Sequence, residues 1–464
     1  MDAKDEGSVP DQGHRLGLAL SGGGSRAAAF HRGTIRALDR VGLLGNVDVV
    51  STVSGGSVFG GAWMAARAAR MSDGGFLDSM ARELEHGFIM RSIRPALLKT
   101  LLPGFTRTEL IANTFDRIFF HGAALGSLPA RPRLCINATV LNHGQVAKFS
   151  RDGFSTWEVR VGGTSPSRVV PITGFRIARA VAASAAFPVG LPPLMLSRAK
   201  DLSGAEFSGD LEGHDSLALT DGGVLENLGV QTLLASDRFW TWDLVVSDAG
   251  TREAPWRPGL LKPLKAAGIA LLSGGALDQV MMLMNAKQNR WMRQHTQLAQ
   301  EESWLAEGLR SSAQGVRMAN GLGAALAERM PFPRRKLLFV RVNQSLESLV
   351  MNIPAWRLIE LWDRSSDLAP PNPLPSTFEE RMQFISDVGI DFTATRDAYR
   401  RLGEARGTER MNSVSTNFTA LKHADVEDLA THAEWQVLAT FALYWGQGSA
   451  AALDLPASLE GSGS

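Results

Sequence analysis

Three glycine-containing turns follow short apolar runs, and together they supply the groups that acyl transfer from an ester requires. That chemistry needs a nucleophile, a base that takes its proton, and hydrogen-bond donors for the oxyanion that forms on the carbonyl. Ser54 directly follows the β-branched run 47–53, Asp221 follows the apolar run 217–220, and Gly22-Gly23-Gly24 follows the run 16–20. Because sites of open α/β sheets gather at the carboxyl ends of strands, we expect these three turns to meet.

The best candidate for the nucleophile is Ser54. A serine on a tight turn between a strand and a helix needs glycines beside it, usually as G-x-S-x-G. The segment Thr52-Val53-Ser54-Gly55-Gly56 lacks the first glycine of that pattern, and a frame centred on Ser57 lacks the last. Ser54 is favoured because it ends the strand, whereas Ser57 would lie a turn into the following helix.

The glycine run is a candidate oxyanion hole. Consecutive glycine amides can point at one spot, and a helix N-terminus adds partial positive charge there. The same run, from Gly22 to Ala27, is close to a dinucleotide-binding fingerprint, which is the alternative. A dinucleotide-binding site requires an acidic residue at the end of a second strand, whereas Asp48 lies at the start of the second expected strand. The Gly-Lys-Ser/Thr ending of a P-loop is absent.

The candidate base is the carboxylate in Asp221-Gly222-Gly223. An aspartate serves as a base when it is partly desolvated and held against the hydroxyl. In an α/β-hydrolase triad a histidine would follow the acid, and His423 and His432 are late enough. Both lie in or beside an amphipathic helical stretch, so neither is singled out, and His31 in the first helix is interpreted as structural.

The elements that must position these residues alternate between strands and helices. Apolar periodicity and glycine or proline boundaries predict both kinds of element. The expected strands are 16–20, 47–53, 134–140, 217–220, 244–247 and 337–342. One expected helix begins after Gly24, and the others are 58–70, 176–186 and 426–445. Such alternation predicts an α/β fold with a parallel central sheet flanked by helices. Segments 75–130 and 255–335 are interpreted as helical insertions on the sheet.

Composition narrows the class of protein. The chain has 464 residues, a formal net charge of +1 and a single cysteine, Cys135, so internal disulfides and multi-thiolate metal sites are excluded. The near-zero charge argues against nucleic acid as a partner. Residues 1–14 and 456–464 are expected to be flexible, without a signal peptide or a spanning helix. The segment 93–105 is interpreted as a helix that covers the core, with a position on a membrane surface as the alternative. Met281, Met282 and Met284 are interpreted as core, with the lining of a lipid channel as the alternative.

The three turns, in this order, resemble those of the patatin-like phospholipases. That family carries D-G-G-G-x-R-G, G-x-S-x-G and D-G-G/A loops, and the segment 180–193 (AVAASAAFPVGLPP) looks like the family segment before the aspartate. The resemblance covers residues 15–250. It assigns Ser54 as the nucleophile and Asp221 as the base, and it assigns the oxyanion loop and supporting positions to the residues Gly22, Gly23, Gly24, Arg26, Gly55, Gly56, Gly222 and Gly223. Ser21, Ala27 and Thr52 depart from the family pattern. They affect loop geometry and not the reacting atoms, so they bear on efficiency and exact substrate more than on reaction class.

The resemblance implies a patatin-like three-layer sandwich that hydrolyses acyl esters of lipids through a Ser–Asp dyad, with no metal and no cofactor. It also implies a lipid or membrane-surface substrate, a cytoplasmic location and peripheral membrane contact. We expect a catalytic core at 15–250 and a mostly helical extension at 251–455 that packs on it and holds at least one further strand. A non-catalytic scaffold with the same fold is the alternative that the three departures leave open, and neither oligomeric state nor lipid class follows from the sequence.

Overall fold

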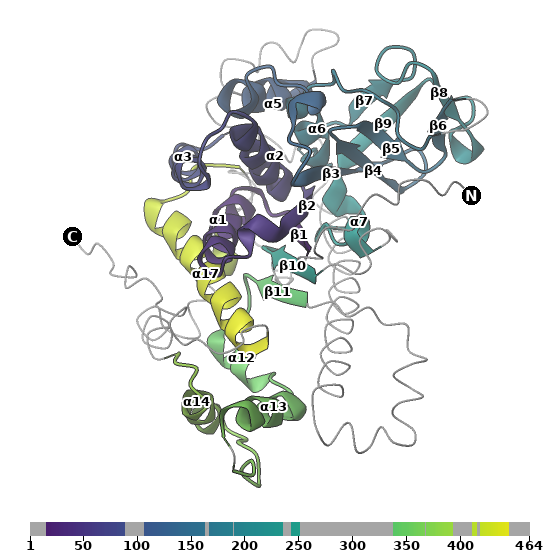
Figure 1. Ribbon diagram of the computed structural model, residues 1–464. Helices are drawn as coiled ribbons and strands as arrows, with labels where there is room; N and C mark the ends of the chain where they lie inside the picture. The colour runs from purple at the N-terminus through teal and green to yellow at the C-terminus, as the bar shows by residue number, and fades with distance from the viewer. Residues whose placement is uncertain are drawn as a thin grey trace, which may run out of the picture.

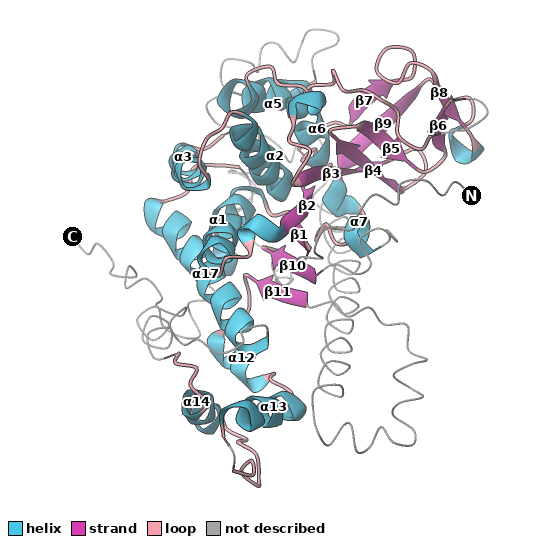
Figure 2. Ribbon diagram, in the orientation of Figure 1, coloured by secondary structure: helices cyan, strands magenta, loops and turns pink. Residues whose placement is uncertain are grey.

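The computed structural model describes nine stretches of the chain: 15–88, 106–162, 167–188, 190–234, 243–250, 337–366, 368–392, 411–414 and 418–444. Within them a nine-stranded mixed sheet lies at the centre, and helices cover it (Figures 1 and 2). The expectations for segment 93–105, for residues 255–335 with their methionines, and for both chain ends fall outside the described stretches. None of the described helices is long and apolar enough to span a bilayer.

The main path of the sheet runs in the order β11-β10-β1-β2-β3-β4-β5, and β9 and β7 branch from β3. The strands are β1 (Leu16–Leu20), β2 (Val47–Val53), β3 (Arg133–Val140), β4 (Gln145–Ser150), β5 (Gly153–Thr156), β7 (Leu194–Ser197), β9 (Ser216–Asp221), β10 (Asp243–Asp248) and β11 (Leu337–Arg341). A separate two-stranded sheet pairs β6 (Val159–Val161) with β8 (Ala205–Phe207).

Strand direction divides the sheet into two parts. The run β11-β10-β1-β2-β3 is parallel throughout. Beyond it, β4 and β9 both run antiparallel to β3, and β5 and β7 run antiparallel to those two strands. The expected mainly parallel sheet flanked by helices is confirmed. The strand that carries Asp221 nevertheless runs antiparallel to β3, because a strand's direction depends on distant pairing that its own residues do not encode.

Apolar residues on both faces of the central strands explain the layered arrangement, since a parallel sheet is covered on both sides. One face of β1 and β2, with Leu18 and Val50, packs into the large core beneath the helices. The other face, with Ala19 and Val49, packs against a smaller cluster that includes Leu233 of α7 (Gln231–Leu234). The sheet therefore lies between two apolar layers.

The helices gather mainly on the first face (Figure 1). They are α1 (Gly24–Arg40), α2 (Gly55–Ala68), α3 (Asp73–His86), α5 (Arg107–Phe115), α6 (Ile177–Ser184), α12 (Leu346–Met351), α13 (Ala355–Ser365), α14 (Phe378–Asp387) and α17 (His423–Tyr444). The three helices α12, α13 and α14 share a second apolar core with the last turns of α17, through Trp435 and Leu443. The individual helices α12, α13 and α14 and the strands β4 to β8 were not predicted, whereas a mostly helical extension was expected in this part of the chain.

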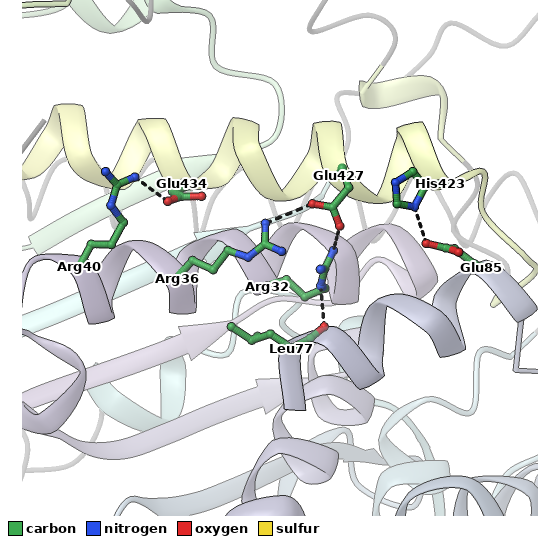
Figure 3. A network of polar contacts seen from close by, with 8 residues as sticks. All are labelled: Arg32, Arg36, Arg40, Leu77, Glu85, His423, Glu427 and Glu434. Atoms are coloured by element: carbon green, nitrogen blue, oxygen red, sulfur yellow. Dashed lines mark hydrogen bonds and ion pairs between the residues drawn. The ribbon is translucent and has the colours of Figure 1, made fainter. Parts of the chain in front are cut away.

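Helix α17 lies along α1, the helix that begins at the glycine run (Figure 1). The two backbones approach closely at Gly33, where a Cβ would collide with the carbonyl of Ala430. Arg32, which is buried, donates to the carbonyl of Leu77 at 3.0 Å and to Glu427 at 2.9 Å (Figure 3). Since α17 comes from the far end of the chain, the C-terminal region supports the helix that carries the glycine run. The division into core and extension remains a prediction.

Candidate active site

Ser54 and Asp221 come together because two strands run toward each other along one edge of β3. Val53, the last residue of β2, pairs with Asn137 of β3. The next residue of β3, Ala138, pairs with Asp221 at the end of β9. Because β2 is parallel to β3 and β9 is antiparallel to it, their carboxyl ends meet head to head. Ser54 follows the first of these ends and Asp221 forms the second.

The backbone of Ser54 adopts a conformation that few non-glycine residues take. Its φ is 50° and its ψ is −119°, at the junction between β2 and α2. Strain of this kind persists where the surrounding structure enforces it, and it is common at functional sites. The turn leaves the side chain half-buried, and its hydroxyl donates a 2.7 Å hydrogen bond to Oδ2 of Asp221.

Asp221 is buried, and both of its carboxylate oxygens accept a hydrogen bond. Oδ2 receives the Ser54 hydroxyl, and Oδ1 receives the Gly223 amide at 2.7 Å. Burial raises the pKa of Asp221 from 3.8 to about 6, and the hydrogen bonds from Ser54 and Gly223 lower it in the opposite direction. The carboxylate is therefore a stronger base than an exposed aspartate, while it stays ionised at neutral pH.

The glycine run lies beside Ser54. A Cβ built on Gly22 would lie 3.1 Å from the Cβ of Ser54. The amide of Gly22 donates to the carbonyl of Asn227 at 2.9 Å, so it is not free to bind an oxyanion. Within the described stretches, the amides of Gly23 and Gly24 donate to no other group, because they precede and open α1. The structure thus narrows the three predicted donors to Gly23 and Gly24.

Two of these glycines occupy conformations that disfavour a side chain. Gly23 has φ 139° and Gly24 has φ 58°. The other glycines of the three turns are needed for close packing. A side chain would collide with neighbouring backbone or with Asn227 at Gly22, Gly55, Gly56, Gly222 and Gly223.

Ser57, the alternative nucleophile, is fully buried in a network of hydroxyls behind the turn. Ser184, at the end of α6, donates to the carbonyl of Asn137 and accepts the amide of Ser54 at 3.0 Å. Its contact with Ser57 at 2.8 Å therefore requires Ser57 to donate. Ser57 therefore supports the turn indirectly, through Ser184, which accepts the backbone amide of Ser54. Ser184 was missed as a site residue, although it lies in the segment 180–193 that resembles the family.

The threonine that stands in place of the first glycine of the elbow fits because its neighbours leave room for it. The Thr52 hydroxyl oxygen lies 2.9 Å from Ser57 Oγ and 3.2 Å from the carbonyl oxygen of Cys135. Its methyl group fills the space above Gly60, where a Cβ would lie only 2.6 Å from Thr52 Cγ2.

Replacing Gly60 by alanine is therefore expected to lower the free energy of unfolding by about 1–3 kcal/mol, the usual range for overpacking. The substitution Thr52→Ser removes the methyl group and keeps the hydroxyl, so the double variant Thr52→Ser/Gly60→Ala should recover most of that loss. Urea unfolding of the parent, both single variants and the double variant measures the coupling. Additive losses would contradict the proposed steric pairing.

The other departures from the family pattern are also accommodated. The Ser21 hydroxyl donates to the carbonyl of Gly22 at 3.0 Å and accepts the amide of Ala249 at 2.8 Å. Ala27 is buried in the core of α1. Arg26 points away from the site, and it donates to the carbonyls of Ala249, at 3.0 Å, and of residues 412 and 414. These contacts tie the glycine run to β10 and to the C-terminal region.

The late histidines contact other parts of the protein. His432 is buried, and its Nε2 lies 2.9 Å from the carbonyl of Val342. Exposed His423 pairs with Glu85 (Figure 3). His31 is buried and contacts Ser247, as its structural interpretation requires. Among the described residues, no histidine forms a hydrogen bond with Ser54 or Asp221, and those residues contain no cluster of three metal-ligating side chains.

The loop after Asp221 contributes residues that the sequence did not single out. Buried Glu226 accepts the amides of Leu228, of Gly229 at 3.0 Å and of Gln231 at 3.2 Å. Burial raises the pKa of Glu226 to about 7, against the effect of these hydrogen bonds. The loop places Asn227 against Gly22, so it links the aspartate turn to the glycine run.

The fold and the site define an α/β protein in which a strained serine contacts a buried aspartate beside a glycine-opened helix. Residues 18–234 match the family model described as patatin-like phospholipase. The match favours the hydrolase interpretation over dinucleotide binding. A search of curated proteins finds no match.

The solved structures to which the chain is similar include those of two proteins. Human GIVD cytosolic phospholipase A2 in complex with methyl gamma-linolenyl fluorophosphonate is 14% identical, with a TM-score of 0.42, over 93% of this chain and 59% of the human chain. Another structure of the human protein gives 14% identity and a TM-score of 0.37 over 50% of this chain, and spans less than half of the human chain, 45%. VipD from Legionella pneumophila gives 14% identity and a TM-score of 0.32, over 95% of this chain and 89% of its own.

Proposed function

We propose that the protein hydrolyses acyl esters of lipids, as a phospholipase A or lysophospholipase does, with Ser54 as nucleophile and Asp221 as base. One observation carries the proposal. The Ser54 hydroxyl donates to the Asp221 carboxylate at 2.7 Å, beside two glycine amides that make no hydrogen bond to a described residue. The match of residues 18–234 to the patatin-like phospholipase family supports the assignment of the substrate as a lipid ester.

In the first half of the reaction Asp221 takes the Ser54 proton as the Ser54 oxygen attacks the acyl carbonyl. The resulting oxyanion accepts hydrogen bonds from the amides of Gly23 and Gly24. Losing one such donor typically costs about 10²–10³ in rate, so these amides supply a large part of the acceleration. When the tetrahedral intermediate collapses, the protonated Asp221 gives its proton to the leaving alcohol, and the acyl group stays on Ser54.

The second half repeats these roles with water. Asp221, again ionised, takes a proton from a water molecule that attacks the acyl carbonyl, and the amides of Gly23 and Gly24 hold the second oxyanion. Collapse breaks the bond to Ser54 and releases the fatty acid, while Asp221 returns the proton to the Ser54 oxygen. The mechanism uses only groups of this chain and requires neither metal nor cofactor.

The surroundings of the pair suit an apolar acyl chain. The Asp221 amide donates to the carbonyl of Ala186 at 3.0 Å, and the next residue, Phe187, is 37% exposed despite its large apolar ring. An exposed ring one residue from the site favours a substrate with a hydrocarbon chain. A membrane-surface substrate reached by peripheral contact, in the cytoplasm, is part of the proposal.

A fluorophosphonate probe tests the proposal directly, because it reacts with activated serines. We expect one adduct per chain, located on Ser54 by peptide mass spectrometry, and no adduct in the Ser54→Ala variant or after heat denaturation. Hydrolysis of a phospholipid in mixed micelles should be lost in parallel, and EDTA should leave the rate unchanged. An adduct on Ser57, or hydrolysis that survives Ser54→Ala, would overturn the assignment.

A further inference from the structure

A group of buried polar side chains lies behind the glycine run, and the proposed reaction uses none of them. His31 and Thr34 of α1 contact Ser247 of β10, where His31 Nδ1 and Thr34 Oγ1 each lie 2.8 Å from Ser247 Oγ. His31 Nε2 lies 3.0 Å from the backbone carbonyl of Ser21, at the start of the glycine run. All four residues are buried.

The partners of His31 determine which ring nitrogen carries the proton. A carbonyl oxygen only accepts, so Nε2 must donate to Ser21. Burial lowers the pKa of His31 to about 4, although the Ser21 hydrogen bond and nearby Asp248 raise it, so the ring is neutral at pH 7. Nδ1 then has no proton and accepts from Ser247, whose oxygen accepts from Thr34. His31 is consequently neutral, both of its ring nitrogens are hydrogen-bonded, and its one N–H donates to the backbone carbonyl of Ser21.

That carbonyl belongs to the peptide unit between Ser21 and Gly22, which is held from both sides. Its C=O accepts from His31 at 3.0 Å, and its N–H donates to the carbonyl of Asn227 at 2.9 Å. Asn227 is in turn placed by the loop that Glu226 holds through three backbone amides. With both ends engaged, this peptide plane cannot rotate without losing a buried hydrogen bond, which costs about 1–3 kcal/mol.

The next peptide unit, between Gly22 and Gly23, is also held by a hydrogen bond. The carbonyl of Gly22 accepts from the Ser21 hydroxyl at 3.0 Å. In a trans peptide the N–H points opposite to the C=O, so the Gly23 amide is directed away from that hydroxyl. Glycine offers little intrinsic resistance to rotation, and Gly23 has φ 139° and Gly24 φ 58°. External hydrogen bonds must therefore fix the direction of these two amides.

We propose that His31 is a positioning residue that fixes the Ser21–Gly22 peptide and thereby aims the Gly23 and Gly24 amides at the acyl carbonyl on Ser54. This inference rests on the proposed function of the pair of Ser54 and Asp221. It assigns His31 no role in proton transfer. Loss of the His31 donor frees the peptide plane, and a displacement of about 1 Å at a reacting group costs about 10²-fold in rate.

Three variants test the inference. His31→Leu keeps the apolar volume and removes the donor, whereas His31→Gln keeps an N–H that can reach the Ser21 carbonyl. Thr34→Val is the matched control, because it removes a hydrogen bond of the same buried network one step farther from the glycine run. The measurements are kcat and KM on a soluble p-nitrophenyl ester, the rate of fluorophosphonate labelling, and thermal unfolding.

We expect His31→Leu to lose about 10²-fold in kcat and in labelling rate with little change in KM. We expect His31→Gln to recover at least a tenfold part of that loss, and Thr34→Val to lose stability while kcat stays within about threefold of the parent. If the activity of all three variants simply follows their stability, or if His31→Leu is fully active, His31 does not position the loop. A parent protein with neither hydrolysis nor labelling overturns the proposed function and this inference together. A parent that is active through Ser54 isolates the inference.

If His31→Leu does not fold, the comparison of His31→Gln with Thr34→Val still decides. The inference requires kcat to depend on the hydrogen-bond donor to the Ser21 carbonyl, and both of these variants keep such a donor. A loss of about 10²-fold in kcat in His31→Gln, which keeps a donor to Ser21, or in Thr34→Val, which keeps His31, contradicts it.

Discussion

The variants Ser54→Ala and Asp221→Asn are each expected to lower kcat by about 10⁴–10⁶-fold, because each removes one half of a pair that acts as a unit. Ser54→Ala removes the atom that forms the acyl bond. Asp221→Asn keeps a side chain of the same shape in contact with the Ser54 hydroxyl but removes the proton acceptor. Ester hydrolysis measured at pH 8 gives both rates, and unfolding curves check that each variant folds.

The control for this prediction is Ser57→Ala. Ser57 lies three residues beyond Ser54 and donates to Ser184 inside the protein, so its loss should affect stability more than kcat. The double variant Ser54→Ala/Asp221→Asn should be no slower than either single variant, because the two groups act in the same step. Losses that multiply in the double variant, or a larger effect of Ser57→Ala, would contradict the pair.

The local pattern of the sequence was sufficient to place Ser54, Asp221 and the glycine run at element boundaries. The run 16–20 is short and apolar, the run 47–53 is largely β-branched and apolar, and the structure has β1 and β2 at those positions. The relative direction of β9 could not be predicted, because it depends on pairing with β3, about 80 residues earlier in the chain. The sequence therefore placed the right turns at strand ends but did not indicate that the strand before the aspartate runs antiparallel to β3.

Residues that act through backbone contacts were missed for a related reason. Ser184 and Asn227 bind the backbone of Ser54 and Gly22 from segments 130 and more residues away. Serine and asparagine are common in ordinary turns, so their residue types carry no warning of such a role. Thr52 shows the opposite case. It looked like a defect in the elbow, and the structure explains it by the space left at Gly60.

The pH dependence of the protein is expected to report Asp221 in two ways, of which activity is the first. Its pKa is raised from 3.8 to about 6 by burial, so the carboxylate must lose its proton near pH 6 before it can act as a base. The value of kcat/KM should rise about tenfold per pH unit below pH 6 and level off above it. Initial rates on a soluble ester between pH 4 and pH 9 give the midpoint. A midpoint near 4 would contradict a desolvated base.

The free energy of unfolding also reports the pKa of Asp221, but the contribution of Asp221 to stability falls with rising pH, whereas activity rises. Because the folded pKa lies above the unfolded value, the folded protein binds the proton more readily than the unfolded chain does. The contribution of Asp221 to stability is therefore greatest below pH 3.8 and falls as pH rises through 6. The shift from 3.8 to about 6 corresponds to about 3 kcal/mol at roughly 1.4 kcal/mol per pH unit.

The variant Asp221→Asn isolates this effect, since asparagine does not titrate. The free energy of unfolding of the variant, relative to that of the parent, should increase by about 2–3 kcal/mol between pH 4 and pH 8. The other buried groups that titrate in this range, Glu226, His31 and His432, are present in both proteins and cancel in the difference. Urea unfolding at both pH values measures it. A substitution that abolishes catalysis and stabilises the fold at pH 8 is expected where a buried charge is kept for chemistry at the expense of stability. A pH-independent difference would mean that Asp221 is not desolvated in the folded protein.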